Sequence, residues 1–381
     1  MTEPVDTDIL IVGAGPVGVT LALLLAGSGL QVRLLDRRPL AAQSADPRAL
    51  ALSHGARQLL EPLGAWPGRD ATAIENIHIS QRGGFGRTVM DRTEYGLPAL
   101  GYVARYGKLA AALQAQLDPA SLIAPAEITS LTTHAGHVAV SIREGNSEHT
   151  LRTRLVVHAE GTPGDDAQIK VRDYGQHAVI AEVQPKPAHG HRAWERFTPD
   201  GPLALLPLGE AFSVVFTVSP EKADHLLSLD DAGFLAALQT QFGQRLRFVG
   251  TGPRARFPLA LRLRENLTAE RQVWIGNTAQ TLHPVSGQGF NLGLRDAWQL
   301  ADTLLTHAKD VGASHALSQY ATKRRIDRQG STAFTDGIVR LFSNDLPPIR
   351  LARGLGLLAL DLFPPARHFV ARRMIWGGRA W

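Results

Sequence analysis

The chain has 381 residues, 44% of them hydrophobic, a formal net charge of +5 at pH 7 and no cysteine. This length and apolar content allow two domains with a sizeable buried core. The lack of cysteine excludes disulfides, thiolate metal sites and cysteine nucleophiles, and it agrees with a reducing compartment. We therefore expect neither a metal centre nor a thiol mechanism.

The positive charge is concentrated near the C-terminus. Residues 340–381 contain seven Arg and two Asp, which accounts for the whole net charge and leaves residues 1–339 net neutral. A nucleic-acid-binding protein normally carries its basic residues over a folded face. The sequence therefore argues against a nucleic-acid partner.

The N-terminal stretch MTEPVDTDILIVGAG has acidic residues and no basic ones. Because it leads directly into a strand pattern, we expect no signal peptide. No apolar run approaches the roughly 20 residues that cross a bilayer. We expect a cytoplasmic protein that is soluble or peripheral on the inner face of the membrane.

The first 36 residues predict a βαβ unit. An apolar strand over 9–12 is followed by the loop GAGPVG, the helical stretch VTLALLLAGSGL and a second short strand over 31–36. The helix is indicated by its length and apolar spacing, and the order of elements is that of a dinucleotide-binding half-domain.

The glycine spacing in this unit indicates a phosphate site. Gly13 permits a tight turn, Gly15 allows the backbone to approach a pyrophosphate, and Gly18 allows the helix to pack on the strand. The helix that begins near Pro16 presents backbone amides to the diphosphate. Asp36, at the end of the second strand, can accept hydrogen bonds from ribose hydroxyls. The alternative is a tight turn without a ligand, but strand, loop, helix and acid all occur together here.

The rest of the chain predicts short strands from residue 75, a helix over 106–117 and a β-rich block over about 176–261. A last buried strand, RQVWIGN, then leads into HPVSGQGFNLGLRDA, a second glycine loop before a helix. One nucleotide-binding domain interrupted by a β-rich insertion accounts for both loops, although about 240 residues separate them. Two helix N-termini on one ligand indicate a long cofactor, with a diphosphate at one and a second electron-rich group at the other.

Together these motifs resemble the FAD-dependent aromatic hydroxylases of the p-hydroxybenzoate hydroxylase type. The likeness rests on GAGPVG, Asp36, the segment DPRALALS around Arg48 and the run HPVSGQGFNLGLRD, and it covers nearly the whole chain. Within that family, GNTAQTLHPVSGQGFNLGLRD and ERFTPDGPLALLPL are similar to the branch that hydroxylates polyprenylated methoxyphenols in ubiquinone biosynthesis.

The resemblance implies an α/β fold, in which a Rossmann-like FAD-binding domain is interrupted by a β-rich substrate domain and followed by a helical C-terminal region. We expect the FAD-binding domain to comprise residues 1–73, 96–175 and 262–335, the substrate domain 74–95 and 176–261, and the C-terminal region 336–381.

It also implies noncovalent FAD and a set of cofactor-binding residues. Pro284 to Leu292 would face the isoalloxazine ring, with backbone amides near Gly289 stabilising negative charge at the flavin N1 and O2 side. Arg48 and Arg105 match positions of flavin contacts in the family, although surface salt bridges are the alternative for both. The full expected set is Gly13, Gly15, Pro16, Gly18, Asp36, Arg37, Arg48, Arg105, Asn277, Pro284, Gly287, Gly289, Phe290 and Asn291.

Two positions depart from the family pattern. Most members have an aspartate that binds a ribityl hydroxyl where this chain has Asn277, whose amide oxygen can keep that hydrogen bond. The family's mid-chain Asp-Gly, serine and arginine correspond here to Glu160-Gly161 and Gly164, with no arginine until Arg172. The second departure leaves open how the chain uses a nicotinamide.

The implied chemistry belongs to the flavin, and no catalytic residue is assigned. FAD reduced by NAD(P)H reacts with molecular oxygen, and the resulting flavin C4a-hydroperoxide hydroxylates an electron-rich phenol ring inside a site that excludes water. His283 lines the flavin either as a base or as a residue that caps or orients the loop. The implied partners are a polyprenyl phenol, oxygen and a ubiquinone-biosynthesis protein complex.

Two other classes of function stay open. Arg37 and Arg38 could hold a 2′-phosphate, as in a nicotinamide-dependent dehydrogenase or reductase, although the run 283–296 argues against it. The altered segment at Glu160 would also suit a non-catalytic subunit of a ubiquinone-biosynthesis assembly.

The C-terminal segment predicts a contact with a membrane surface. A helix over 349–363 would carry a leucine stripe, and arginines and aromatic residues beside it suit an interfacial helix on anionic lipid. The alternative is that the stripe packs on the FAD-binding domain. The residues concerned are Leu351, Leu355, Leu358 and Leu362, with Arg350, Arg353, Arg367, Arg372, Arg373, Phe369, Trp376 and Trp381.

Overall fold

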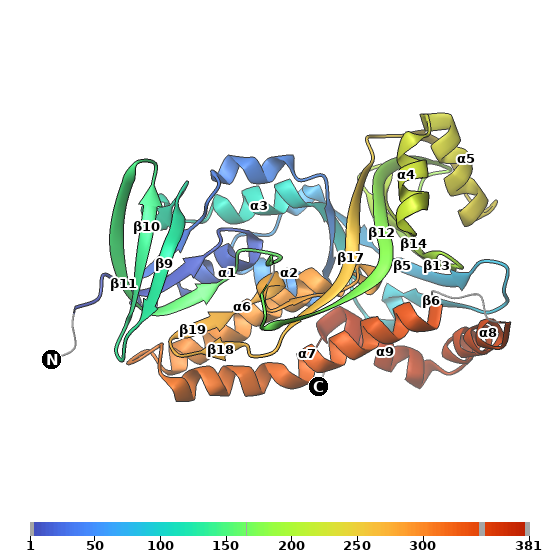
Figure 1. The fold of residues 1–381 in the computed structure, drawn as a ribbon. Coiled ribbons are helices and arrows are strands. Elements are labelled where there is room, and N and C mark those ends of the chain that lie inside the picture. The colour runs from blue at the N-terminus through green and yellow to red at the C-terminus, as the bar shows by residue number, and fades with distance from the viewer. Residues whose placement is uncertain (1–3, 165, 343–346, 378–381) are drawn as a thin grey trace.

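The computed structural model describes residues 4–164, 166–342 and 347–377, and Figure 1 shows two large sheets with helices around and between them. The predicted α/β fold is confirmed, with a Rossmann-like region, a β-rich region and a helical C-terminal region. Trp381, which we expected to anchor the C-terminus, lies outside the described residues.

The first sheet is the Rossmann-like sheet. Its central strand β1 pairs in parallel with β11 and β2, and β9 and β10 extend it in the antiparallel sense. Ile9 and Ile11 face the helices, while Leu10 and Val12 face the β9–β10 hairpin, so β1 is buried on both sides. The strand order is β18 (Thr268–Ala269), β19 (Gln272–Trp274), β11 (Ser147–His158), β1 (Thr7–Val12), β2 (Val32–Leu35) and β8 (Leu122–Ile123), with β10 (Val138–Glu144) and β9 (Glu127–Thr133) off this path.

The second sheet is the β-rich region. One of its faces is covered by α4 (Pro220–Ser228) and α5 (Asp231–Phe242), which Figure 1 shows on its outer side. Its strand order is β20 (Gln280–Thr281), β17 (Ala255–Arg264), β12 (Ile169–Lys186), β15 (Ala211–Val218), β14 (Gly201–Leu208), β13 (Arg192–Thr198), β5 (Asn76–Gln81) and β6 (Arg87–Asp91), with β16 (Arg247–Thr251) beside β12. Because β12 pairs within this sheet from its first residue, it crosses the expected boundary at residue 175. The domain boundaries stay a prediction.

A small third sheet joins the two regions. It consists of β3 (Ala49–Ser53), β7 (Gly101–Arg105) and β4 (Ala71–Ile74). Ile74 and Val103 pack against Ala193 and Leu208 of the second sheet.

The remaining helices and 3-10 turns lie around the sheets. They are α1 (Pro16–Leu25), α2 (His54–Leu60), α3 (Tyr106–Gln114), α6 (Gln288–Thr306), η1 (Leu40–Ala45), η2 (Gly68–Asp70), η3 (Arg92–Tyr95), η4 (Pro119–Ser121), η5 (Gly276–Thr278) and η6 (Val285–Gly287).

The C-terminal helices are α7 (Ser314–Phe342), which runs across the expected boundary at residue 336, α8 (Pro347–Leu362) and α9 (Pro364–Trp376). Figure 1 shows α7 along one side of the molecule and α8 near β6. Pro364 and Pro365 end α8 because proline cannot continue a helix. None of the described helices combines the length and the apolar content that would let it cross a bilayer.

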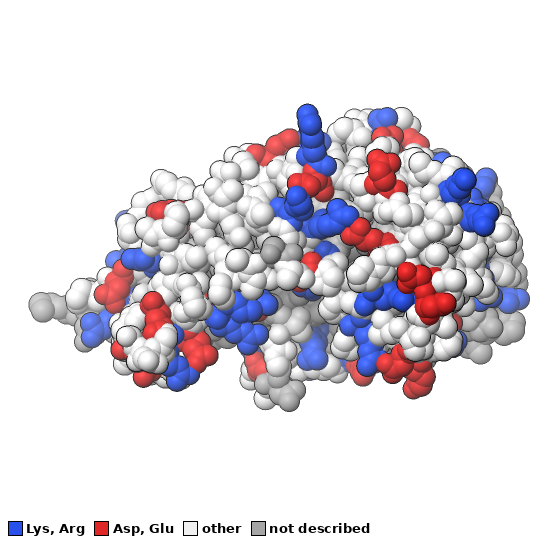
Figure 2. Space-filling view, turned by 90° about the horizontal axis from the view of Figure 1, so that it is seen from above, with Lys and Arg blue, Asp and Glu red and all other residues white. Residues whose placement is uncertain are grey.

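Two C-terminal arginines and one tryptophan differ from the expected membrane contact. Arg353 is buried and donates to the carbonyl of Phe342, and Arg367 pairs with Glu94 at 2.9 Å. Trp376 packs edge to face on His54 of α2. These side chains hold the C-terminal helices on the protein, so they are not the free cations and the aromatic anchor that the sequence suggested. Elsewhere, Figure 2 shows Lys and Arg interspersed with Asp and Glu.

Candidate active site

The first glycine loop is built so that only glycine fits at two of its positions. Gly13 has φ +105°, and a Cβ there would lie 2.5 Å from the Ala159 carbonyl. A Cβ on Gly18 would lie 2.0 Å from the Gly13 carbonyl oxygen. At Gly15 the nearest atom to a Cβ is Tyr106 Oη at 3.7 Å, an ordinary contact distance, so the fold itself does not require glycine there.

The start of α1 offers backbone amides to that ligand. The described first turn has no acidic residue and no side-chain cap, so its amides are open to an anion. Asp36 is buried, and its carboxylate accepts from the amides of Ala14 and Arg38, both at 2.9 Å. Gln43 Nε2 donates to the Ala14 carbonyl at 2.8 Å. Asp36 therefore holds the loop in place in addition to its predicted contact with a ribose.

We expect Asp36→Ala to weaken FAD binding by about 1.5–3 kcal/mol, the scale of a hydrogen bond to a charged group. The FAD dissociation constant, measured by quenching of flavin fluorescence, tests this. Asp36→Asn is the matched control, because its amide oxygen still accepts from Ala14, and it should lose less. Unchanged affinity in the alanine variant would remove Asp36 from the site.

The second glycine loop lies beside the first. Gly276 in η5 has φ +63°, and a Cβ there would lie 3.3 Å from Val17 of α1. A Cβ on Gly293 of α6 would lie 3.0 Å from Val17 and 3.2 Å from the Gly276 Cα. These close approaches pack α6 on α1, so motifs far apart in the sequence form one site. Asp296, 1% exposed, fixes the arrangement by accepting from the Gly276 amide at 3.0 Å.

The α6 N-terminus is anchored by the side chain of Asn291. Its Oδ1 accepts from the Ser53 amide at 2.8 Å, and its Nδ2 donates to the carbonyls of Ala51 and Gly287 at 2.9 and 2.7 Å. No described atom lies within 4 Å of a Cβ placed on Gly289, and the described first turn has no acid and no side-chain cap. This end of α6 is therefore open to an electron-rich group, as a flavin ring would require.

His283 holds the loop that leads to α6. It is 1% exposed, its Nδ1 accepts from the Val285 amide at 3.0 Å, and its ring meets Tyr174 edge to face. Burial lowers the pKa of His283 to about 4, so the ring is neutral at pH 7 and its proton is on Nε2. Its acceptor nitrogen is already used, which supports loop orientation over the role of a base.

Other predicted flavin contacts lie at different distances from the two loops. The Arg48 guanidinium donates hydrogen bonds to both oxygens of the Asp46 carboxylate. It also lies 5.3 Å from the centre of the Tyr106 ring, and Tyr106 is the residue nearest to Gly15. Asn277 is half-buried in η5, with a 3.4 Å contact from its Nδ2 to Thr162. The structure thus brings Arg48 and Asn277 to the two loops.

Arg105 and Arg37 point elsewhere. Arg105 pairs with Glu182 of β12 at 2.6 Å, so it ties the small sheet to the second sheet, and Arg37 is exposed. Pro284 is exposed on the second loop and Phe290 is packed against the main core. For Arg105 to bind FAD it would have to leave Glu182.

Glu195 is a candidate site residue that the sequence pattern does not reveal. It lies in β13 between Ala193, which packs on the small sheet, and Phe197, which packs on Val285 of the second glycine loop. Because alternate residues of a strand share a face, the Glu195 side chain lies on the face of the second sheet that packs on the small sheet and on the second glycine loop. The only signal in the sequence is an acid between two apolar residues of the same face.

The Glu195 carboxyl is deep in the protein. The side chain keeps some accessible surface, although the carboxyl itself is strongly desolvated. Its Oε1 has no hydrogen-bond partner among the described residues. Burial raises the pKa of Glu195 to about 8, which is a suitable value for proton exchange with a phenol.

An apolar pocket lies beside the α6 N-terminus. Its walls come from β3, β5, β6 and α9, and they include Ala51, Ile77, Met90, Gly287 and Met374. Such a lining suits an aromatic ring with an apolar tail. The pocket shares Gly287, Gln288 and Asn291 with the second glycine loop and the α6 N-terminus, so these features form one candidate site.

A Rossmann-like sheet with two glycine loops on one ligand site, and a second sheet that faces them, define a flavoprotein of the monooxygenase class. The FAD binding domain family matches residues 6–335 of this chain. The chain therefore belongs to that family and is an FAD-dependent monooxygenase.

Similar proteins carry related names. The chain is 35% identical to "Ubiquinone hydroxylase UbiL" of Rhodospirillum rubrum, over 96% of this chain and 88% of that protein. It is 32% identical to the "3-demethoxyubiquinol 3-hydroxylase" of Escherichia coli, over 93% and 95%. The crystal structure of p-nitrophenol 4-monooxygenase PnpA from Pseudomonas putida DLL-E4 has the same fold, with a TM-score of 0.80, 17% identity and coverage of 99% of this chain and 100% of that one.

Proposed function

We propose that the protein hydroxylates a polyprenylated methoxyphenol in ubiquinone biosynthesis. The observation that carries this proposal is the apolar pocket beside the open α6 N-terminus, with the Glu195 carboxyl on the face of the second sheet that packs on the second glycine loop. The relatives named as ubiquinone and demethoxyubiquinol hydroxylases support the substrate class.

The described residues fit FAD, because the open space at Gly289 and the two helix N-termini without side-chain caps suit an isoalloxazine ring and a diphosphate. Bound FAD supplies the activation of molecular oxygen, and NAD(P)H is the proposed reductant. The chain's own residues bind and orient the cofactor and exclude water from the ring.

Glu195 is proposed to act on the substrate hydroxyl. An ionised carboxylate in this position accepts the hydrogen bond of the phenol and takes up its proton, which makes the ring more electron-rich. A carboxyl whose pKa is raised to about 8 by burial is closer to the pKa of a phenol than an exposed glutamate is.

Oxygen uptake by the purified protein tests the proposed function. We expect a flavin absorption spectrum, and oxygen consumption that depends on NAD(P)H and on a short-chain prenyl methoxyphenol, with hydroxylated product in equal amount. Reduction of a substrate without oxygen would favour a dehydrogenase instead. A protein that takes up no FAD would contradict both.

The substrate of this proposed reaction is nearly insoluble in water. The protein therefore collects it from a membrane or from a partner in a biosynthetic complex. We propose the membrane route through the C-terminal region, because the leucine stripe of α8 is exposed and does not pack on the FAD-binding region.

A further inference from the structure

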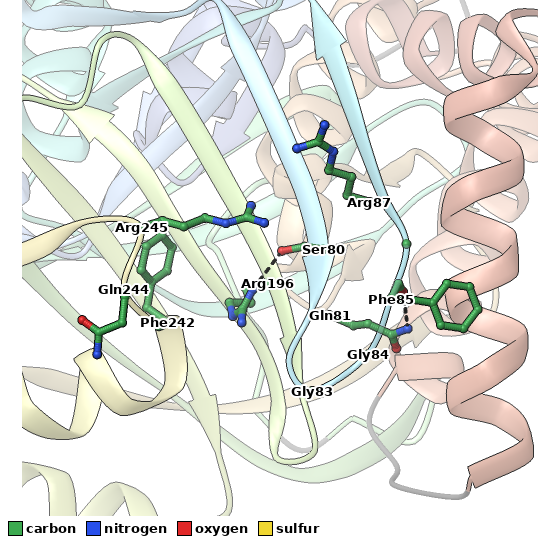
Figure 3. A pocket seen from close by; sticks show the side chains of 12 residues that line it. Ser80, Gln81, Gly83, Gly84, Phe85, Arg87, Arg196, Phe242, Gln244 and Arg245 are labelled. Carbon is green, nitrogen blue, oxygen red and sulfur yellow. Dashed lines mark hydrogen bonds between the residues drawn. The ribbon is translucent and has the colours of Figure 1, made fainter.

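A basic pocket lies on the face of the second sheet opposite to Glu195. It has a cavity volume of about 350 Å³ and lies between the β5–β6 hairpin, β13 and the turn from α5 to β16. Figure 3 shows Arg87, Arg196 and Arg245 around Ser80. Arg196 follows Glu195 in β13 and so points to the other face, which means that the sheet separates this pocket from the proposed active site. Its volume is in the range of about 300–1,000 Å³ that small ligands occupy.

Among the described residues, the hydrogen-bond partners of Arg196 and Arg245 are all neutral. Arg196 donates to the Gln241 carbonyl at 3.1 Å and to Ser80 Oγ at 3.3 Å. Arg245 Nη1 lies 2.7 Å from His78 Nε2. Among the described residues that line the pocket there is no Asp or Glu. Within the described lining, the positive charge of the pocket therefore has no carboxylate beside it.

Burial and the positive charge of the pocket lower the pKa of Arg196 and of His78. Burial and then the charges of Arg245 and Arg82 lower the pKa of Arg196. Burial and the charges of Arg245 and Arg87 lower the pKa of His78 to about 4. An anion with several acceptor oxygens, such as a phosphate, would relieve this repulsion and receive charge-assisted hydrogen bonds.

The same hairpin connects the pocket to α8. A Cβ on Gly86 would lie 2.2 Å from the Gly354 carbonyl oxygen, so the loop and the helix are in direct contact. Gln81 Nε2 donates to the carbonyls of Phe85 and Arg350 at 2.9 and 3.2 Å. Figure 3 shows Phe85 directed toward the helix. The hairpin loop thus has the basic pocket on one side and α8 on the other.

The outer face of α8 is apolar. Leu357 and Gly354 are turned inward, whereas Leu351, Leu355, Leu358 and Leu362 are 38–72% exposed. Their spacing puts them on one stripe of the helix. An exposed apolar stripe next to a cation pocket is the arrangement of a protein that lies on an anionic lipid surface.

We propose that the basic pocket binds the phosphate of an anionic phospholipid while the leucine stripe of α8 enters the same membrane. This inference rests on the proposed lipid-soluble substrate, since the membrane is where that substrate is found. Because Arg353 and Arg367 are held by the protein itself, the basic pocket takes their place among the cations of the contact.

Sedimentation with vesicles tests the proposal, using the full FAD-containing chain at low salt. We expect binding to phosphatidylcholine vesicles that contain phosphatidylglycerol, and weak binding without it. Arg87→Gln with Arg245→Gln should weaken this binding by about 25-fold, since one cation near an anionic surface is worth about fivefold. Arg325→Gln, an exposed arginine of α7, is the matched control and should bind as the original chain does.

The apolar half of the contact has its own pair of variants. Leu351→Gln with Leu355→Gln should abolish vesicle binding, whereas Ile326→Gln, which is 73% exposed on α7, should not. All six substitutions are at exposed side chains, and flavin absorbance and the melting temperature confirm that each variant is folded.

Two results would overturn the proposal. The first is equal binding of phosphatidylglycerol vesicles by the double arginine variant and the original chain. The second is a shift of the His78 resonances by inorganic phosphate in a protein that does not bind vesicles, which would assign the pocket to a free anion. Vesicle binding needs no turnover, so hydroxylation of a water-soluble methoxyphenol separately tests the proposed function.

Discussion

The Glu195→Gln variant is expected to fold, bind FAD and lose about 100-fold or more in kcat/KM for hydroxylation, the scale of general acid–base catalysis. Glutamine keeps the size of the side chain but cannot take up the substrate's proton. Oxygen uptake coupled to product formation measures the loss. Glu210→Gln, in the exposed turn between β14 and β15, is the matched control and should retain full activity.

The pH dependence of this variant separates catalysis from structure. Because the ionised carboxylate is the base, kcat/KM of the original chain should rise with pH and level off above about 8. The rise should disappear in Glu195→Gln and persist at a lower rate in Glu195→Asp. Parallel pH profiles for the original chain and the glutamine variant would contradict the proposed role.

Stability gives a second readout for Glu195. Its folded pKa of about 8 lies above the ordinary value of 4.5, so the folded state binds the extra proton between these values. The stabilisation by the neutral carboxyl is complete below about pH 4.5 and is lost, at up to about 1.4 kcal/mol per pH unit, as the pH rises to 8. Urea unfolding should therefore show Glu195→Gln gaining stability relative to the original chain over that range.

The Asp296→Ala variant is expected to lose about 3–5 kcal/mol of unfolding free energy, because it removes one of the two carboxylates that neutralise the buried Arg324. Asp296 accepts from Arg324 Nε at 2.7 Å and from Gln280 Nε2 at 2.5 Å, and both Asp296 and Arg324 are at most 5% exposed. Burial acts to lower the pKa of Arg324, but the charges of Asp296 and Asp327 raise it overall. The same change frees the Gly276 amide, so flavin content should fall as well.

Urea unfolding of the purified variant measures this effect. Asp302→Ala on the same helix is the matched control, since Asp302 is exposed and pairs with Lys323 at 3.1 Å on the surface. It should cost no more than about 1 kcal/mol. Equal losses in the two variants would show that the buried network does not stabilise the second glycine loop.

Local sequence determined the elements that carry the cofactor. The order strand, glycine loop, helix and acid around Gly13 and Asp36 follows from constraints between residues that are near in the chain, and the structure has β1, α1 and β2 in those places. The same holds for the leucine stripe of α8, where helical spacing alone put four leucines on one face. Backbone conformation and side-chain periodicity are local, so they can be predicted from a short segment.

Tertiary structure decided which side chains meet. Asn291 accepts from the backbone of β3, Asp296 accepts from the Gly276 amide, and the buried Arg353 donates to Phe342. Each hydrogen bond joins two segments, and no local sequence pattern predicts that these segments lie together. Glu195 is a site candidate only because Ala193 and Phe197, on the same face of β13, pack on the small sheet and on the second glycine loop. The basic pocket likewise needs the β5–β6 hairpin, β13 and the α5–β16 turn to come together. The burial of a side chain and the charges beside it depend on long-range packing. The sequence therefore could not show which arginines the fold buries or pairs and which it leaves exposed.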